Sequence, residues 1–81
     1  MGELDVVARD GPALVIVEVR TRSSNRFGGA AASVDSRKQV KIRRAAALLI
    51  YQHKELASLP IRFDVIAMRG TEIQWIKSAF I

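Results

Sequence analysis

Acidic residues stand within two apolar stretches near the start of the sequence, GELDVVARDG and VIVEVRTR, and these residues are Glu3, Asp5 and Glu18. Both stretches predict β-strands, on which a carboxylate is costly to bury. Two carboxylates about 4 Å apart also repel by roughly 1 kcal/mol in water, and by about 4 kcal/mol at an effective dielectric constant of about 20. If the chain brings these acids together, a positive charge must offset the repulsion.

Two sources of that charge remain open. Arg20 or Arg9 can form an ion pair on the face of the sheet, which would be a structural arrangement without catalysis. A divalent cation is the alternative, because carboxylate oxygens suit Mg²⁺, which binds one or two carboxylates together with water and substrate phosphate. A motif this short does not decide between the two interpretations.

The hairpin expected at the Asp10-Gly11 turn signal decides whether the acids share a face. The position numbers of Asp5 and Glu18 add up to 23, and an odd sum is compatible with a loop of two or four residues. The longer loop would set the two acids opposite each other, and the shorter one would make them diagonal neighbours on the same face. An even sum would place them on opposite faces.

The rest of the chain supplies the elements that must position these residues. Apolar alternation and turn residues predict strands over residues 3–9, 14–20, 62–68 and 72–77, a loop over 23–33, and a helix from 35 or 36 to about 57. The order β-β-α-β-β predicts a single α/β domain over residues 1–81, with a sheet covered by a helix on at least one face.

Positive charge is concentrated in the middle of the sequence. Between residues 20 and 44 the net charge is +7, and the remaining residues carry −2, which gives the total of +5. A cluster of this kind favours a polyanionic partner such as nucleic acid. Arg37, Lys41 and Arg44 are spaced to form a ridge on one face of the helix, with Lys38 at its start. We expect this basic ridge, Lys38, and the nearby loop residues Arg22 and Arg26 to contact phosphates.

The helix has a second notable pattern, because apolar residues occupy more than one of its faces. A stripe expected to face the sheet contains Ile42, Ala45, Ala46, Leu49, His53 and Leu56. The opposite side is also apolar at Ala47, Leu48 and Tyr51. Such a side needs a cover, which a second copy of the chain or a missing element would provide. A homodimer is therefore a candidate assembly.

Several classes of protein are excluded or disfavoured by composition. The chain has no cysteine, so it has no disulfide, thiolate nucleophile or Cys-based metal site. Its longest apolar run, residues 45–51, is much shorter than the roughly 20 residues of a membrane span, and no signal-peptide pattern opens the sequence. We expect a cytoplasmic protein without a membrane partner. Structural roles are the expectation for Asp64, as an ion-paired or hydrogen-bonded residue, and for Trp75, as a packing residue.

The blocks GELDVVARDG, LVIVEVRTRSSNRFGGAAASVDSRKQVKIRRAA, RFDVIAM and IQWIKSAF resemble the YraN-like family, a bacterial group within the PD-(D/E)XK nuclease-like superfamily. The resemblance covers nearly the whole chain in one order. It implies a restriction-endonuclease-like mixed sheet with flanking helices. Members of that superfamily include restriction enzymes and Holliday-junction resolvases, so DNA, including branched DNA, is the implied partner.

The resemblance also implies roles for individual residues. Asp5 corresponds to the first metal-binding acid of the motif and Glu18 to the second, and Val19 would offer its backbone carbonyl to the same Mg²⁺ or Mn²⁺ ion. Arg20 stands where the motif has its lysine, which makes it the third candidate catalytic residue beside Asp5 and Glu18. These residues would hydrolyse a phosphodiester, with the ion activating a water molecule.

The sequence departs from the family pattern in two places. Arginine stays protonated, so Arg20 can stabilise charge but cannot act as a general base. Family members usually begin with a helix upstream of GELD, and its absence here suggests a fragment of a longer protein. Two alternatives to an endonuclease follow: a nucleic-acid-binding module without turnover, and a dimeric interaction subunit.

Overall fold

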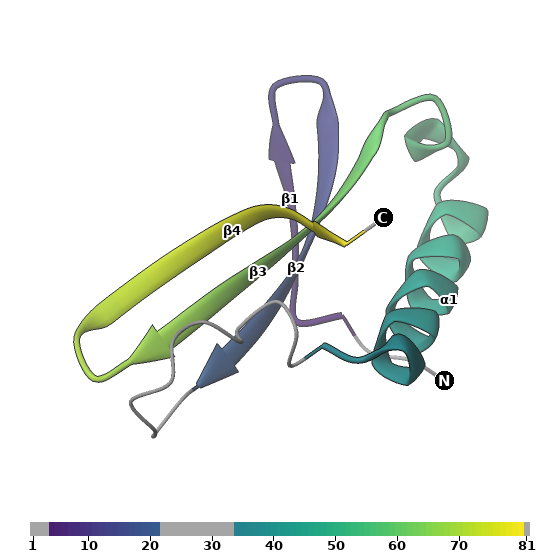
Figure 1. Ribbon diagram of the computed structural model, residues 1–81. Helices are drawn as coiled ribbons and strands as arrows, with labels where there is room; N and C mark the ends of the chain where they lie inside the picture. The colour runs from purple at the N-terminus through teal and green to yellow at the C-terminus, as the bar shows by residue number, and fades with distance from the viewer. Residues whose placement is uncertain (1–3, 22–33, 81) are drawn as a thin grey trace.

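The computed structural model describes residues 4–21 and 34–80, in which the elements follow the order expected from the sequence (Figure 1). Two strands come first, β1 (Val6–Asp10) and β2 (Ala13–Thr21). The helix α1 (Ser36–Gln52) follows, and a short 3₁₀ helix, η1 (Lys54–Leu56), comes after it. The last strands are β3 (Ile61–Arg69) and β4 (Glu72–Phe80). The predicted α/β class and β-β-α-β-β order are confirmed.

The four strands form one mixed sheet in the order β1-β2-β3-β4. The β1–β2 and β3–β4 pairs are antiparallel, whereas β2 and β3 are parallel. Parallel neighbours need a long crossover connection, and here that connection contains α1, which lies on one side of the sheet (Figure 1). The strand β2 is therefore an interior strand with a partner at each edge, while β1 has one partner.

The register of the first hairpin determines which residues share a face. Asp10 is opposite Ala13, so the position numbers of cross-strand partners add up to 23. Gly11 and Pro12 lie between these partners, and Gly11 has φ of +58°, a conformation that is least strained without a Cβ atom. The odd sum is confirmed, and the even-sum arrangement that would separate the acids is excluded. The expectation that a two-residue loop makes Asp5 and Glu18 diagonal neighbours was wrong, because the loop is Gly11-Pro12 rather than Asp10-Gly11 and the continued register sets the two acids opposite each other.

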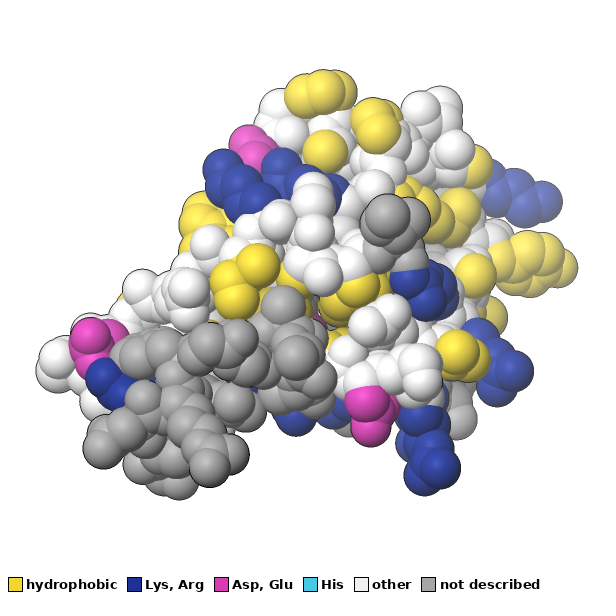
Figure 2. All heavy atoms as spheres, viewed as in Figure 1, with side chains coloured by type: hydrophobic (Ala, Val, Ile, Leu, Met, Phe, Trp, Pro, Cys, Tyr) yellow, Lys and Arg dark blue, Asp and Glu magenta, His cyan; other side chains and the backbone are white. Residues whose placement is uncertain are grey.

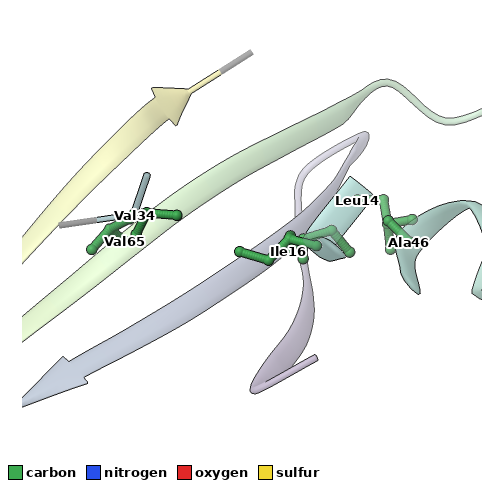
Figure 3. Close-up of a cluster of buried hydrophobic side chains, with 6 residues drawn as sticks. Leu14, Ile16, Val34, Ala46 and Val65 are labelled. Atoms are coloured by element: carbon green, nitrogen blue, oxygen red, sulfur yellow. The ribbon is translucent and has the colours of Figure 1, made fainter. Parts of the chain in front are cut away.

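The hydrophobic core lies between α1 and the sheet. Figure 3 shows Leu14 and Ile16 of β2, Val65 of β3 and Ala46 of α1 in this core, together with Val34, which precedes the helix. Leu14 and Ile16 are two residues apart and point to the same side of β2. Each is 2% exposed. The helix covers this part of the sheet, as the pattern of its apolar residues predicted.

The start of α1 is the one predicted from the sequence. The side chain of Asp35 caps the helix by accepting a hydrogen bond from the backbone N–H of Lys38 at 2.9 Å. The buried residues of the helix belong to the predicted stripe and are Ile42, Ala45 and Ala46.

The end of α1 differs from the prediction. The helix ends at Gln52 rather than near Ala57. His53 caps it through its backbone N–H, which donates to the carbonyls of Leu49 and Ile50, and its exposed side chain lies 3.8 Å from Glu55. The expectation that His53 faces the core was wrong, because the helical period stops one residue before it. Within the described ranges, no helix has the length and apolar character needed to cross a membrane.

Candidate functional site

Glu18 lies on the interior strand β2 and is buried, with 5% of its surface exposed. Alternation along the strand places its side chain on the same side of the sheet as Leu14 and Ile16, at the end of the core beneath α1. Removing a carboxylate from water costs several kcal/mol unless cationic partners and hydrogen bonds compensate. The burial of Glu18 therefore requires positive charge close by.

Two cationic side chains contact the same oxygen of Glu18. Lys38 Nζ, from the first turn of α1, lies 3.0 Å from Glu18 Oε2, and Arg20 Nη1 lies 3.5 Å from it. Both contacts end on Oε2 of the buried carboxylate. Two cations of the protein therefore offset the charge of this buried carboxylate.

Asp5 lies immediately before β1 and reaches β2 through its side chain. Its Oδ2 accepts a hydrogen bond from the backbone N–H of Val19 at 2.9 Å. In a regular antiparallel ladder this N–H would bind the facing backbone, so the carboxylate extends the pairing past the end of β1. The N–H and C=O groups of one strand residue point to the same neighbour, so the Val19 carbonyl also faces the side of Asp5. The same register, continued by one residue, sets Asp5 opposite Glu18.

The structure therefore brings Asp5, Glu18, Val19 and Arg20 together where the β1–β2 ladder ends. The donors suit a hard divalent cation: Glu18 and Asp5 offer carboxylate oxygens, and the hydrogen bond from Val19 N–H to Asp5 ends on Oδ2. Among the described residues, no three His, Cys, Asp or Glu side chains lie close enough together to hold a metal ion by themselves. An ion at this place would keep water and substrate oxygens as ligands, as Mg²⁺ commonly does.

The basic ridge lies on the exposed surface of α1. Arg37, Lys41 and Arg44 are exposed, and no ion pair ties any of them to another described residue. Figure 2 shows Lys and Arg side chains in dark blue on the side of the molecule where α1 lies. Their charge is therefore available to a partner.

Lys38 is separate from this ridge, although both are expected from the sequence to contact phosphates. Its ammonium group points to Glu18 and belongs to the acidic site. The pattern of the sequence carried no signal for this contact, which depends on how α1 crosses the sheet. The remaining predicted phosphate contacts, Arg22 and Arg26, lie outside the described residues, as does Glu3.

A second buried carboxylate, Asp64 on β3, is fully occupied by hydrogen bonds. Arg62 donates to both of its oxygens at 2.9 Å, the indole N–H of Trp75 donates at 2.8 Å, and the backbone N–H of Ser78 donates at 3.0 Å. Burial alone would raise the pKa of Asp64, but these hydrogen bonds hold its pKa below the ordinary value. Four donors fill the acceptor sites of a carboxylate, so Asp64 is structural. The predicted ion pair with an arginine is confirmed.

Trp75 joins β4 to this network. Its indole N–H is bound to Asp64, while 52% of the residue is exposed and Lys77 Nζ lies 4.9 Å from the ring centroid. The network continues through Arg62 Nη1, which donates to Asp10 Oδ2 at 2.9 Å. Strand β4 and the first hairpin are therefore both held to β3 by side chains around one buried carboxylate.

Comparison with known proteins assigns the chain to a family. The model of the uncharacterised protein family UPF0102 matches residues 1–68. A UPF0102 protein of Xanthomonas euvesicatoria pv. vesicatoria (strain 85-10) is 57% identical over 81 residues, which cover 98% of this chain and 66% of that protein. The chain belongs to the UPF0102 family, the group to which the YraN-like resemblance pointed.

More distant relatives match the same share of this chain. A UPF0102 protein of Pseudomonas savastanoi pv. phaseolicola (strain 1448A / Race 6) is 51% identical over 84 residues, covering 98% of this chain and 68% of that protein. One from Enterobacter sp. (strain 638) is 46% identical over 80 residues, covering 98% of this chain and 61% of that protein. The chain thus spans about two thirds of the length of the curated relatives it matches.

Proposed function

We propose that this chain is the core of a metal-dependent, PD-(D/E)XK-type endonuclease domain that hydrolyses phosphodiesters in DNA, including branched DNA. The observation that carries the proposal is the hydrogen bond from Val19 N–H to Asp5 at the end of the β1–β2 ladder, where the continued register sets Asp5 opposite Glu18. The burial of the Glu18 carboxylate beside a second acid supports a cation there.

The ion, Mg²⁺ or Mn²⁺, would supply Lewis-acid stabilisation of the phosphate and a bound water of lowered pKa. Asp5 and Glu18 would hold it through their carboxylate oxygens, and the backbone carbonyl of Val19 would be the third protein donor. Arg20 would contribute fixed positive charge to the developing negative charge on the phosphate. The guanidinium stays protonated, so proton removal from water is left to the ion and to solvent.

The basic ridge would provide the sequence-independent part of DNA binding. Arg37, Lys41 and Arg44 are exposed cations at helical spacing, which suits contacts with successive phosphates of a backbone. Contacts of this kind orient the duplex without reading its bases. The proposal therefore assigns substrate positioning to α1 and the chemical step to β1 and β2.

A nucleic-acid-binding module without turnover is the second candidate. It is favoured by Arg20 in place of the motif lysine and by the ion pairs that already neutralise Glu18. Both candidates predict DNA binding by the basic ridge. Only the endonuclease requires Asp5 and Glu18 for cleavage of the DNA.

A cleavage assay separates the two candidates. Linear, flap and junction DNA are incubated with Mg²⁺ or Mn²⁺ and the wild-type protein, Asp5→Asn or Glu18→Gln. The nuclease proposal predicts cleavage by the wild type and loss of at least about a hundredfold in either variant, as expected when a metal-binding group is removed. Equal activity in all three proteins, including none, rejects the nuclease and leaves the binding module. Lys54→Gln, a change of one exposed cation after α1, is the control.

A further inference from the structure

The contact between Lys38 and Glu18 joins the helix to the acidic site. The distance from Lys38 Nζ to Glu18 Oε2 is 3.0 Å, shorter than the 3.5 Å from Arg20 Nη1 to the same oxygen. The side chain of Lys38 is 44% exposed, whereas that of Glu18 is 6% exposed. An exposed, flexible ammonium group therefore neutralises a buried carboxylate that is itself held on a rigid interior strand.

We infer that Lys38 is an exchangeable counter-ion: it holds Glu18 in the metal-free protein and is displaced when a divalent cation binds there. This inference rests on the metal site of the proposed function. Two cations that contact one carboxylate repel each other, so each weakens the binding of the other. Lys38 is the partner that can move, since its charge sits on a flexible stem that already reaches solvent.

Displacement has a consequence for substrate binding. The ammonium group starts beside the site and belongs to the same helix as the basic ridge. Once released from Glu18, it is close enough to the site to contact a phosphate oxygen held there. Lys38 is thus a positioning residue whose two partners, carboxylate and phosphate, correspond to the empty and loaded states of the site.

Metal binding without nucleic acid tests this exchange. Mn²⁺ is titrated into wild type, Lys38→Gln, Lys38→Arg, Lys41→Gln and Glu18→Gln, and free Mn²⁺ is followed by electron paramagnetic resonance. Lys38→Gln should bind Mn²⁺ about tenfold more tightly than wild type, within the range typical of coupled sites. Lys38→Arg should stay near wild type because it keeps the cation. Lys41→Gln removes the same charge from the next turn of α1 and should change the affinity by less than about threefold.

The outcomes distinguish the inference from the proposed function. If wild type, Lys38→Gln and Lys41→Gln bind Mn²⁺ equally and Glu18→Gln does not bind it, the metal site stands and the counter-ion role is overturned. If Glu18→Gln binds Mn²⁺ as tightly as wild type, the metal site itself is rejected, and the inference with it.

Thermal unfolding gives a second readout, which also shows whether Lys38→Gln is folded. In chelator, Lys38→Gln should melt at a lower temperature than Lys41→Gln, because Glu18 has lost its closest cation. Mn²⁺ should raise the melting temperature of Lys38→Gln more than that of wild type, since a ligand that binds the folded state stabilises it by mass action. An equal or smaller rise contradicts the exchange.

Discussion

Arg62 and Asp64 are two residues apart on β3, and the guanidinium of Arg62 holds both carboxylate oxygens of Asp64 at 2.9 Å each. The pair lies on the same side of the strand, since residues two apart share a face. The side chain of Asp64 is fully buried, while that of Arg62 is 20% exposed and reaches out to Asp10. The ion pair therefore connects the interior of the sheet with the turn of the first hairpin.

Asp64→Asn should destabilise the fold strongly. The variant leaves the partly exposed guanidinium of Arg62 without its principal partner, and breaking a fully buried pair in this way typically costs about 3 to 5 kcal/mol. We expect the free energy of unfolding to fall by about 3 kcal/mol, because Arg62 keeps its ion pair with Asp10 and its side chain is partly exposed to water. Urea unfolding followed by circular dichroism measures the loss. Glu72→Gln, which breaks the exposed Arg69–Glu72 pair, is the control and should cost less than about 1 kcal/mol.

The stability of the protein should depend on pH through Asp64. Its folded pKa lies below the ordinary value of 3.8, so the unfolded state takes up this proton first as pH falls. The contribution is fully present above about pH 4 and is lost as pH falls through the folded pKa. Trp75 is the only tryptophan of the chain and binds Asp64, so its fluorescence should follow this loss.

Subtraction isolates the Asp64 contribution from those of other acids. Free energies of unfolding are measured between about pH 2 and pH 6 for wild type and Asp64→Asn. The difference between the two proteins should shrink toward acid pH. A difference that stays constant over this range would contradict the role assigned to Asp64.

Substitutions of Asp5 should separate its structural role from its chemical one. Asp5→Asn keeps an oxygen that accepts the Val19 N–H, so the free energy of unfolding should change by less than about 0.5 kcal/mol. Asp5→Ala removes the acceptor and should cost about 1 kcal/mol. Both variants should lose Mn²⁺ affinity, measured as described above. An Asp5→Asn protein that binds Mn²⁺ like wild type would show that this acid serves the hairpin alone.

The basic ridge should make DNA binding strongly dependent on salt. Each phosphate contact contributes about 0.9 to the slope of log K against log salt concentration for duplex DNA. Replacing Arg37, Lys41 and Arg44 together by Gln should lower that slope by up to about 3. Fluorescence anisotropy with a labelled duplex at several salt concentrations measures it. An unchanged slope would show that the basic ridge does not contact the phosphates of DNA. These residues are exposed, so the melting temperature should change little.

Much of the fold was predictable because local patterns specify it. Apolar β-branched runs identified the strands, and Asp35 and Ser36 marked the start of the helix. The position numbers of the two acids left only a few possible registers for the first hairpin. The end of α1 was not predictable in the same way. Its apolar spacing continues through His53 and Leu56, yet the chain turns into η1 there, and spacing alone does not reveal where a helix stops.

The sequence predicted the acidic residues of the candidate site. It did not predict which cations contact them. Asp5 and Glu18 stand out because carboxylates are unusual in apolar strands. The contact from Lys38 depends on the angle and position of α1 over the sheet, which helical periodicity does not encode. The network around Asp64 likewise needed the β3–β4 register, which contains a bulge between Phe63 and Val65 and brings Trp75 and Ser78 to one carboxylate.

The two acids are held by parts of the sheet that differ in how firmly they are anchored. Glu18 sits on a strand with a neighbour at each edge, whereas Asp5 stands just outside the outermost strand. Outermost strands open more readily than interior ones, and such local opening is detected as fast amide hydrogen exchange. Each local opening of β1 would move Asp5 away from Glu18. The site would then assemble and come apart with the fraying of β1, without any unfolding of the strand that bears its buried acid.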